Sequence, residues 1–350
     1  MTLMLEEIHQ QPEKIRLTLD RERGRLGAIA AEVKRRNPAV VVIAARGSSD
    51  NAATYAKYLW GLYARLPVMF AAPSLTTVYH TVPTLRDALL IGISQSGEST
   101  DIVEVVRGHH AQGTYTLAIT AVEASTLAQI ADVHALCHVG VERAVAATKT
   151  YTTELAVLAL LGALLSPDAA LLDALGRVPQ AISAVLASLD ATVMNVERYR
   201  YMAACAVIGR GLNHCTAQEI ALKLKETSYV VADPFSEADF RHGPIAIVGS
   251  DFPLLLFAPP GETYPDMLEL ARDLRSKHAD IVVFSSEPAI LELATVPVKM
   301  PDPVAPGRAG EAVSPLIYAV AGQLFAHGLC VTKGLDPDQP RGLHKVTFTL

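Results

Sequence analysis

Residues 87–106, "DALLIGISQSGESTDIVEVV", contain the local pattern that most clearly indicates the fold class. The apolar run at 88–93 predicts a buried strand, and the apolar positions after Asp101 predict the start of a helix. Between them, "SQSGEST" (94–100) carries five hydroxyl or amide side chains around Gly97 and no lysine. The stretch therefore reads as a strand, a polar turn and a helix, which is the repeating element of a parallel α/β sheet.

The same alternation occurs on both sides of this stretch. "AVVVIAARG" (39–47) predicts a strand before a helix near 50–63, and "YTLAIT" (115–120) predicts a strand after a helix near 99–110. Strands that alternate with helices favour a mostly parallel sheet flanked by helices. The predicted fold class is therefore α/β.

The series of motifs returns 164 residues later, without a gap. The matching pairs are Arg46-Gly47 with Arg210-Gly211, Asp87 with Asp251, Gly97-Glu98 with Gly261-Glu262, and "TLAIT" (116–120) with "DIVVF" (280–284). Four matches in register indicate an internal duplication. The predicted organisation is a helical N-terminal segment (1–36), a first domain (37–165), a helical linker (166–196), a second domain (197–330) and a C-terminal tail (331–350).

Composition excludes several classes of protein. The net charge is −6 and the pI is near 6.0, and no basic stripe is present, which argues against a nucleic-acid partner. The N-terminus lacks the pattern of a signal peptide, and the longest apolar stretch, around Leu155–Leu165, is too short to span a membrane. The four cysteines have no C-x-x-C spacing and read as reduced core thiols. We expect a soluble cytoplasmic protein with no membrane partner.

The polar turn has two interpretations, which the turn alone leaves about even. Serines favour the N-cap of a helix in any case, but a turn that opens a helix also offers N–H groups and hydroxyls to a phosphate ester. The second copy has "APPGETY" (258–264) at this position and lacks these donors, so we expect one ligand site per chain, built mainly by the first copy. The candidate phosphate-binding residues are Ser94, Gln95, Ser96 and Ser99, together with Ser48 and Ser49 of "ARGSSD" (45–50), since neighbouring strand ends share one crevice.

The second copy carries different candidate chemistry. Glu219, Lys223 and Glu226 share one face of a predicted helix, which is either a solvated face with an ion pair or a catalytic face. "FRHGP" (240–244) places His242 at a predicted turn. Lys345 lies in a Gly/Pro-rich tail, where a lysine is ordinarily only solubilising.

Six motifs in this order resemble the double-SIS (sugar isomerase) family of phosphosugar enzymes. They are "ARGSSD", "SQSGEST", "AVAATKTYT" (144–152), "EIALKLKETSY" (219–229), "HGP" and "DPDQPRGLHKVT". The chain resembles the isomerase half of glucosamine-6-phosphate synthase, and still more the single-function SIS-type glucosamine-6-phosphate deaminases. The resemblance covers the chain from about residue 38 onwards, so the two predicted domains would be tandem SIS domains.

The resemblance implies a role for each candidate residue. Ser49, Ser94, Gln95, Ser96 and Ser99 would bind the sugar phosphate, and Val145 would line the sugar pocket. Glu226 would be the general base that moves a proton between C1 and C2, and Lys223 would assist it. His242 would open the sugar ring from the neighbouring subunit of a homodimer, and Lys345 would form an imine with the open-chain ketose under the closing C-terminal tail. No cofactor and no metal are implied, and no His/Cys/Asp cluster in the sequence suggests a metal site.

The implied reaction converts glucosamine 6-phosphate and water to fructose 6-phosphate and ammonia. The sequence departs from the family pattern at Asp239 and His344, and it lacks the synthase's glutaminase domain. Three alternatives stay open: synthesis of glucosamine 6-phosphate with ammonia or a separate glutaminase, action on a related amino-sugar phosphate, and non-catalytic phosphosugar sensing. The short segment before the first strand leaves no room for the helix-turn-helix domain of a sensor.

Overall fold

The computed structural model describes residues 1–343 and 345, which form two compact units. The β1–β5 unit consists of Glu13–Glu142, Lys149–Gly176 and, from the C-terminal segment, Lys345. The β6–β10 unit consists of Met1–Pro12, Arg143–Thr148 and Arg177–Leu343. His344, one of the departures noted from the sequence, lies outside the described residues.

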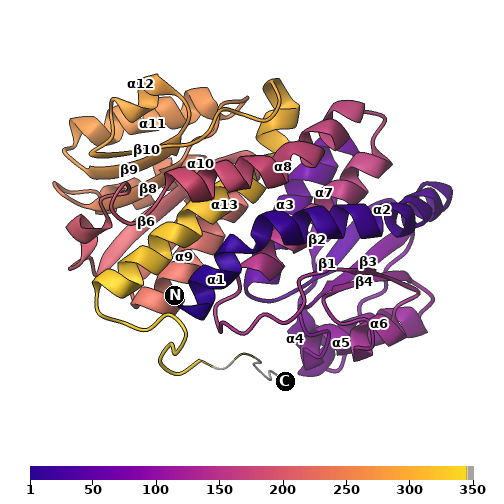
Figure 1. Cartoon of the computed structure of the whole chain (residues 1–350). Helices are drawn as coiled ribbons and strands as arrows, with labels where there is room; N and C mark the ends of the chain where they lie inside the picture. The colour runs from indigo at the N-terminus through magenta and orange to yellow at the C-terminus, as the bar shows by residue number, and fades with distance from the viewer. Residues whose placement is uncertain (344, 346–350) are drawn as a thin grey trace. The chain divides into compact units, whose positions relative to one another are not determined.

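The sheet of the β1–β5 unit has five parallel strands in the order β2-β1-β3-β4-β5 (Figure 1). The strands are β1 (Val40–Ala44), β2 (Val68–Phe70), β3 (Ala88–Ile93), β4 (Tyr115–Thr120) and β5 (Val133–Leu136). Because helices cover both faces of a parallel sheet, its central strands are apolar along their whole length. Accordingly, every residue of β4 is buried.

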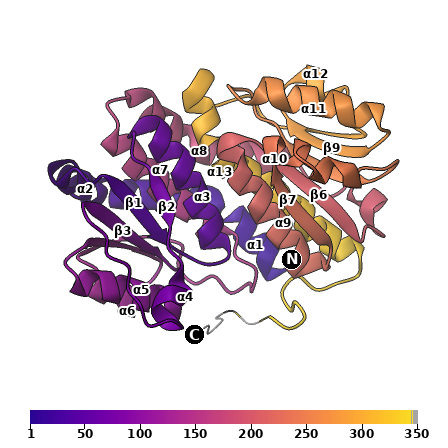
Figure 2. The same cartoon turned by 180° about the vertical axis from the view of Figure 1, so that it is seen from behind.

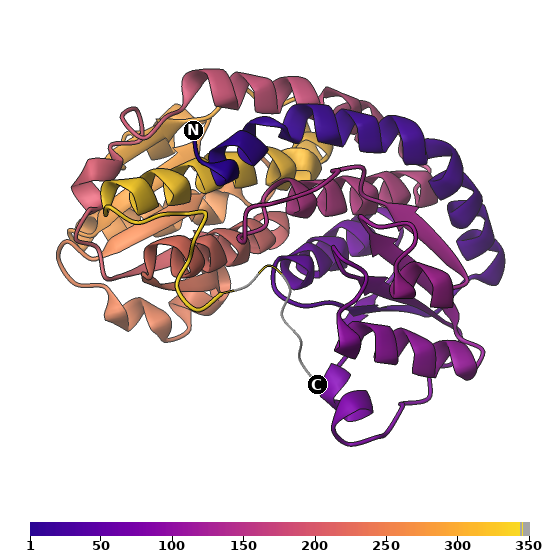
Figure 3. The ribbon, with the colours of Figure 1, turned by 60° about the horizontal axis from the view of Figure 1, so that its bottom comes forward.

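Helices cover both faces of this sheet, with α5 (Thr100–Ala111) and α6 (Thr126–Ile130) on one side of the strands and α3 (Ser48–Tyr63) and α7 (Lys149–Leu165) on the other (Figure 1). On the first side, alternate strand residues pack against apolar residues of α5 and α6, including Ile102, Val106 and Leu127. On the other side, the Trp60 indole of α3 donates a hydrogen bond to the Leu158 carbonyl of α7 at 3.0 Å. Figure 3 shows α2 (Gln11–Arg36), in indigo, as a long curved helix. The short helix α4 (Pro73–Thr77) follows β2.

The sheet of the β6–β10 unit also has five parallel strands, in the order β10-β9-β8-β6-β7. The strands are β6 (Ala204–Gly209), β7 (Val231–Ser236), β8 (Pro253–Phe257), β9 (Asp280–Ser285) and β10 (Val296–Lys299). Read from the edge strand β7 inwards, this order repeats the order of the other sheet. The two sheets therefore have the same topology.

Helices again form two layers around this sheet. Figure 2 shows α11 (Tyr264–Ser276) and α12 (Pro288–Leu291) together on one side of the strands, with α9 (His214–Ser228) and α13 (Gly307–Thr332) on the other. Phe257 and Phe284 stack at 4.6 Å between ring centroids, and Phe325 of α13 meets Phe284 edge-on at 6.1 Å. The remaining elements are α1 (Leu3–His9), α8 (Ala169–Ser188), which runs across the division between the units, α10 (Glu237–Arg241) and the 3₁₀ turns η1 (Val196–Tyr199), η2 (Gly211–Asn213) and η3 (Pro244–Ile247).

The predicted duplication and the predicted α/β fold are confirmed. Strands β1 and β6 begin at Val40 and Ala204, and helices α5 and α11 begin at Thr100 and Tyr264, so both pairs keep the offset of 164. The matched residues also share backbone conformations. Gly47 and Gly211 have φ of 56° and 57°, and Asp87 and Asp251 have φ of 47° and 62°, all in the left-handed region that L-residues other than Asn and Asp avoid.

Two helices of the described chain, α8 and α13, are long and apolar enough to cross a membrane by length and composition. Of the apolar window of α13, 89% is buried inside the protein, where it packs beside α9 and the sheet. Its apolar composition therefore serves a core position. The corresponding window of α8 is 39% buried, as for a helix with one face on the protein.

Candidate functional site

The two serine-containing turns follow the carboxyl ends of β1 and β3, which are neighbours in the sheet. In the strand order 2-1-3-4-5, the chain changes direction across the sheet between its first and third strands. Ligands of open α/β sheets bind outside the carboxyl ends of the strands at this switch point. The topology therefore brings Ser48–Ser49 and Ser94–Ser99 to the edge of the sheet where a ligand is expected.

The hydroxyl groups of the turn at Ser94–Ser99 bond to other groups of the same turn. The Ser94 and Ser99 hydroxyls lie 3.0 Å apart, and the Gly97 N–H donates to Ser94 Oγ at 3.2 Å. The Glu98 N–H donates to Ser96 Oγ at 3.2 Å. The Gln95 carbonyl accepts hydrogen bonds from Ala121 N and Thr120 Oγ1, so its backbone is tied to the end of β4. The turn is thus preformed, and it presents several hydroxyls at the start of α5.

Gly97 and Glu98 have structural roles, as the duplication suggested. Gly97 has φ of 68°, and a Cβ atom at this position would lie 2.2 Å from Ser125 Oγ. The Glu98 carboxylate accepts hydrogen bonds from the Thr126 N–H at 2.8 Å and the Thr126 hydroxyl at 2.7 Å, so it fastens the turn to the start of α6. The contacts within the protein therefore account for Gly97 and Glu98, and neither needs a role in ligand binding.

The corresponding turn of the second copy, residues 258–263, is occupied by a carboxylate of the protein itself. Glu311 Oε2 accepts a hydrogen bond from the Glu262 N–H at 2.6 Å, and Glu311 Oε1 accepts from Thr263 N at 3.3 Å and Thr263 Oγ1 at 2.5 Å. Glu311 is buried on α13. The residue 164 positions earlier is Ala147, which has no carboxylate to offer. The turn at 258–263 therefore binds a carboxylate that the protein itself supplies.

The first serine turn is linked to α7 by a buried hydrogen bond. Ser49 Oγ donates to Glu154 Oε1 at 2.9 Å, and both side chains are buried. Ser48, at the first position of α3, is half-buried. The structure therefore places Ser49 close behind the turn, where Glu154 fixes the direction of its hydroxyl.

Lys345 contacts a buried carboxylate in the β1–β5 unit. Its Nζ lies 3.0 Å from Glu142 Oε2, and Glu142 also accepts hydrogen bonds from the Thr150 N–H and hydroxyl at the start of α7. Lys149, the first residue of α7, is buried and donates to the Val141 carbonyl at 2.8 Å. The start of α7 is therefore a polar cluster within an otherwise apolar helix.

In the β6–β10 unit, the predicted face of α9 is a buried ion cluster and is not solvated. Lys223 Nζ lies 3.4 Å from Glu219 Oε1 and 2.6 Å from Glu226 Oε2. The side chains of Glu219 and Lys223 are 0% exposed, and that of Glu226 is 22% exposed. Although burial lowers the pKa of Lys223, the two carboxylates outweigh this effect and hold the pKa above its usual value. The interpretation of this face as a solvated ion pair is therefore wrong.

His242 and Val145 also belong to the β6–β10 unit. His242 is exposed just after α10, and its backbone N–H donates to the Asp239 carbonyl at 3.1 Å. Val145 is half-buried, and the preceding segment is held by Glu7 of α1, whose carboxylate accepts from Arg143 N at 2.6 Å and Ala144 N at 3.1 Å. The local backbone of both residues is therefore well defined.

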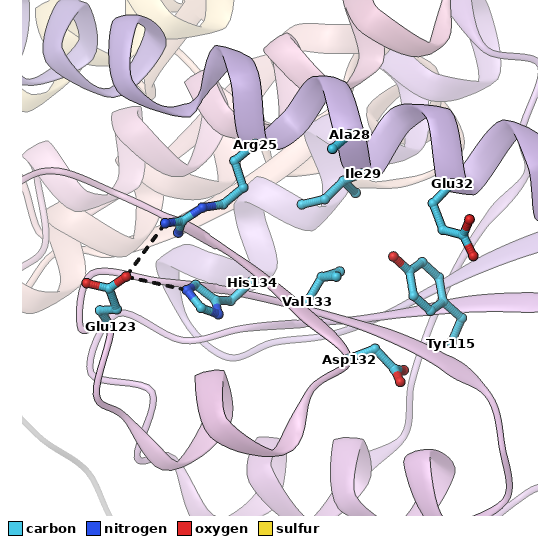
Figure 4. Close-up of a pocket in the computed structure, with 9 residues that line it drawn as sticks. All are labelled: Arg25, Ala28, Ile29, Glu32, Tyr115, Glu123, Asp132, Val133 and His134. Atoms are coloured by element: carbon cyan, nitrogen blue, oxygen red, sulfur yellow. Dashed lines mark ion pairs between the residues drawn. The ribbon is translucent and has the colours of Figure 1, made fainter.

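A separate cavity of about 500 Å³ lies between α2 and the β4–β5 edge of the β1–β5 unit (Figure 4). Figure 4 shows Glu123 joined by dashed lines to Arg25 and His134. The corresponding N–O distances are 3.6 Å and 3.8 Å. The cavity is lined by Arg25, Ala28, Ile29, Glu32, Tyr115, Glu123, Asp132, Val133 and His134. None of these is a residue that the sequence predicted for the site, so we assign no part of the reaction to this cavity.

A family model described as "SIS domain" matches residues 35–164 and 204–292. The two matched segments contain all five strands of the first sheet and β6 to β9 of the second. The chain belongs to the SIS-domain family. The predicted resemblance to the SIS family is thereby confirmed.

Individual relatives resemble this SIS-domain chain along nearly its whole length. Glutamine–fructose-6-phosphate aminotransferase [isomerizing] of Thermococcus kodakarensis is 33% identical over 353 residues, which cover 98% of this chain and 57% of that protein. The chain thus spans somewhat over half the length of the curated relatives it matches. A crystal structure from Silicibacter pomeroyi DSS-3, named as that of a phosphosugar isomerase, is 33% identical, has a TM-score of 0.86 and covers 97% of this chain and 100% of its own. The C-terminal domain of glucosamine-fructose-6-phosphate aminotransferase from Francisella tularensis is 26% identical, with a TM-score of 0.84 and coverage of 97% and 98%.

Sequence reasoning missed three buried carboxylates: Glu142 and Glu154, which contact the predicted residues Lys345 and Ser49, and Glu311, which contacts the turn of the second copy. Each lies in or beside an apolar helix, α7 or α13. Acidic residues in an apolar helix are almost never buried without partners. That rule marks them as candidates for a polar role but does not identify the group each one contacts.

Proposed function

We propose that this SIS-domain chain is a phosphosugar aldose–ketose isomerase that converts glucosamine 6-phosphate and water to fructose 6-phosphate and ammonia. The observation that carries the proposal is the contrast between the two equivalent turns. Glu311 supplies an internal anion to the turn at 258–263, whereas the hydroxyls of Ser94–Ser99 bond within their own turn at the switch point of the sheet. In the turn at Ser94–Ser99, a phosphate group would take the place that the Glu311 carboxylate takes in the turn at 258–263.

In this proposal, the phosphate is bound by Ser94, Gln95, Ser96 and Ser99, with Ser48 and Ser49 beside them. Hydroxyl and backbone N–H donors at a helix N-terminus suit a dianionic ester, because the helix dipole favours negative charge there. The names of the similar proteins, a phosphosugar isomerase and two aminotransferases of fructose 6-phosphate, support a sugar phosphate as the ligand.

Glu226 is assigned as the general base. It is the one carboxylate of the α9 ion cluster that keeps some exposure, and the Lys223 ammonium lies 2.6 Å from it. A carboxylate that takes a proton from C2 of the open-chain aldose and returns it to C1 leaves an imine carbon at C2. Lys223, which stays protonated, serves to hold Glu226 in place.

His242 and Lys345 are assigned to the steps before and after proton transfer. His242 opens the sugar ring from the second subunit of a homodimer, since histidine gains and loses protons near neutral pH. The Lys345 ammonium passes a proton to the substrate imine nitrogen, the freed lysine amine adds to C2, and ammonia leaves; water then hydrolyses the lysine imine to give fructose 6-phosphate and the free lysine. Val145 lines the sugar pocket, and the enzyme is soluble and cytoplasmic and uses no cofactor.

A second candidate function is the synthetic direction, in which the chain forms glucosamine 6-phosphate from fructose 6-phosphate and ammonia, supplied free or by a separate glutaminase. The names of the similar aminotransferases favour this candidate. A non-catalytic sensor of phosphosugars is a third candidate. The buried ion cluster on α9 favours an enzyme over a sensor. Burial of charged groups lowers stability, and a protein that only binds a ligand does not require such a cluster.

One set of assays distinguishes these candidates. Ammonia release is measured with glucosamine 6-phosphate, galactosamine 6-phosphate and a fructosamine phosphate, and amino-sugar formation is measured with fructose 6-phosphate and ammonium. We expect faster ammonia release from glucosamine 6-phosphate than from the other two amino-sugar phosphates. Formation of amino sugar without measurable ammonia release would favour the synthetic function, and ligand binding without turnover in either assay would favour a sensor.

A further inference from the structure

We infer that Glu142 is the residue that positions the Lys345 amine for imine formation, an inference that rests on the proposed function. The Glu142 side chain is 0% exposed, whereas that of Lys345 is 26% exposed. Their contact joins residues 203 positions apart in the sequence. The ammonium is therefore held on one side by a buried carboxylate while part of the lysine side chain is accessible.

The other contacts of Glu142 fix the direction of its carboxylate. Oε1 accepts from Thr150 N at 3.1 Å, and Oε2 accepts from Thr150 Oγ1 at 2.9 Å. Both donors belong to the first turn of α7, whose backbone is set by the core of the β1–β5 unit. Because Thr150 holds both oxygens of Glu142, the position of Lys345 Nζ is tied to a rigid helix and does not depend only on the tail.

Without a contact that fixes its position, a lysine amine approaches a reacting carbon in many orientations. Its side chain has four rotatable bonds, and its amine visits many positions unless a contact selects one. Catalysis by a covalent intermediate requires the amine to approach the reacting carbon in one geometry. Glu142 supplies that constraint through Lys345 and is therefore a positioning residue.

Glu154 provides a matched control on the same helix. It is also a buried glutamate of α7, but it accepts its hydrogen bond from Ser49 Oγ, at 2.9 Å, and belongs to the serine turn. Glu154→Gln and Glu142→Gln each replace one buried carboxylate by a nearly isosteric amide. Only Glu142→Gln removes the charge that faces Lys345.

The test is reductive trapping of the lysine imine. The full chain is incubated with saturating fructose 6-phosphate and sodium cyanoborohydride, and the rate of adduct formation at Lys345 is measured by peptide mass spectrometry per folded molecule. Glu142→Gln is expected to slow trapping by roughly tenfold or more, the size of effect for a lost hydrogen bond to a charged group. Glu154→Gln is expected to raise the KM for the phosphosugar and, at saturation, to slow trapping less than Glu142→Gln does. Lys345→Arg keeps a cation for Glu142, has no reactive amine and defines zero trapping.

Each outcome decides the inference. Trapping of Glu142→Gln at the wild-type rate, with normal trapping in the wild type, would overturn the positioning role and leave the proposed function intact. No adduct at Lys345 in the wild type would overturn both. Should Glu142→Gln fail to fold, Glu142→Asp keeps the charge on a shorter side chain and is expected to trap at an intermediate rate; wild-type trapping in this variant would also count against the inference.

Discussion

The Lys223 ammonium lies 2.6 Å from the Glu226 carboxylate, one turn along the same face of α9. Lys223 is fully buried, and Glu226 lies at the exposed end of the cluster that Glu219 closes on the buried side. Although desolvation lowers the pKa of Lys223, its two carboxylate neighbours raise it above the ordinary value. The pair therefore presents one partly exposed carboxylate whose position is fixed by a buried ammonium.

Glu226→Gln should lose at least about 10² in kcat, since positioned general bases contribute on the order of 10²–10⁴. KM should change little, because the amide keeps the shape of the side chain. Exchange of the substrate C1/C2 proton with solvent deuterium, followed by NMR, should disappear in the same variant. Glu219→Gln is the control, because it alters the buried partner of Lys223 and should retain the exchange. Normal exchange in Glu226→Gln would mean that another residue is the base.

Ser96→Ala and Ser99→Ala should each raise KM for the phosphosugar about tenfold or more, the loss expected for a hydrogen bond to a charged group. Each variant loses one hydrogen bond within the turn, but the overall fold should persist because Gly97 and Glu98 also hold the turn in place. Thr263→Ala, in the duplicate turn, should lower stability and leave KM unchanged. An unchanged KM in both serine variants would contradict the assignment of Ser96 and Ser99 as phosphate-binding residues.

Glu311→Ala should destabilise the protein by about 1–3 kcal/mol, because removal of the carboxylate leaves Glu262 N, Thr263 N and Thr263 Oγ1 without their acceptor. Formate, a carboxylate small enough for the vacated space, should raise the Tm of this variant more than that of the wild type. Chloride at equal ionic strength is the control in the thermal scans. Equal effects of formate and chloride on Glu311→Ala would show that the turn does not bind anions.

His327 should contribute to the loss of stability in mild acid. Burial lowers the pKa of this imidazole from its usual 6.5, with Asp338 opposing the shift and His9 adding to it. Because the folded pKa lies below the unfolded one, the contribution is complete above pH 6.5 and is lost as the pH falls through the folded pKa. His327→Gln should therefore show a shallower fall in Tm between pH 6.5 and pH 5 than the wild type. Parallel curves for the two proteins would contradict the prediction.

A mixture of Glu226→Gln and His242→Ala chains should recover activity that neither variant has alone. If His242 acts in the site of the neighbouring subunit, a hybrid dimer contains one site with both residues intact. Activity is measured after subunit exchange has been verified by native mass spectrometry. Verified hybrids that stay inactive would place His242 and Glu226 of the same chain in one site, or remove His242 from the reaction.

Much of the fold was predictable because its signals are local. Apolar runs at 39–47, 88–94 and 115–120 identified β1, β3 and β4, and the constant offset of 164 identified the second sheet. Strand and helix periodicity is set by neighbouring residues, so it survives in a single sequence. The position of the serine turns at the switch point follows from the same order of strands.

The pairing of side chains was not predictable in this way. The burial of Lys223 follows from the packing of α9 against the sheet and α13, and a helical wheel shows only that Glu219, Lys223 and Glu226 share a face. A solvated ion pair and a desolvated cluster have the same spacing along the chain. They differ only in whether neighbouring elements exclude water, which determines the electrostatic strength of the cluster.

The residue patterns were sufficient to identify a duplicated α/β protein of the SIS-domain family, with a polar turn after β3 whose donors the second copy lacks. They could not show that Glu311 fills the corresponding turn of the second copy, because this carboxylate reaches the turn from a helix 48–49 residues further along the chain. The same holds for the contact between Lys345 and Glu142, which are separated by 203 residues. Residue patterns report local backbone preferences, whereas the partner of a buried charge is chosen by the packing of elements that are distant in the sequence.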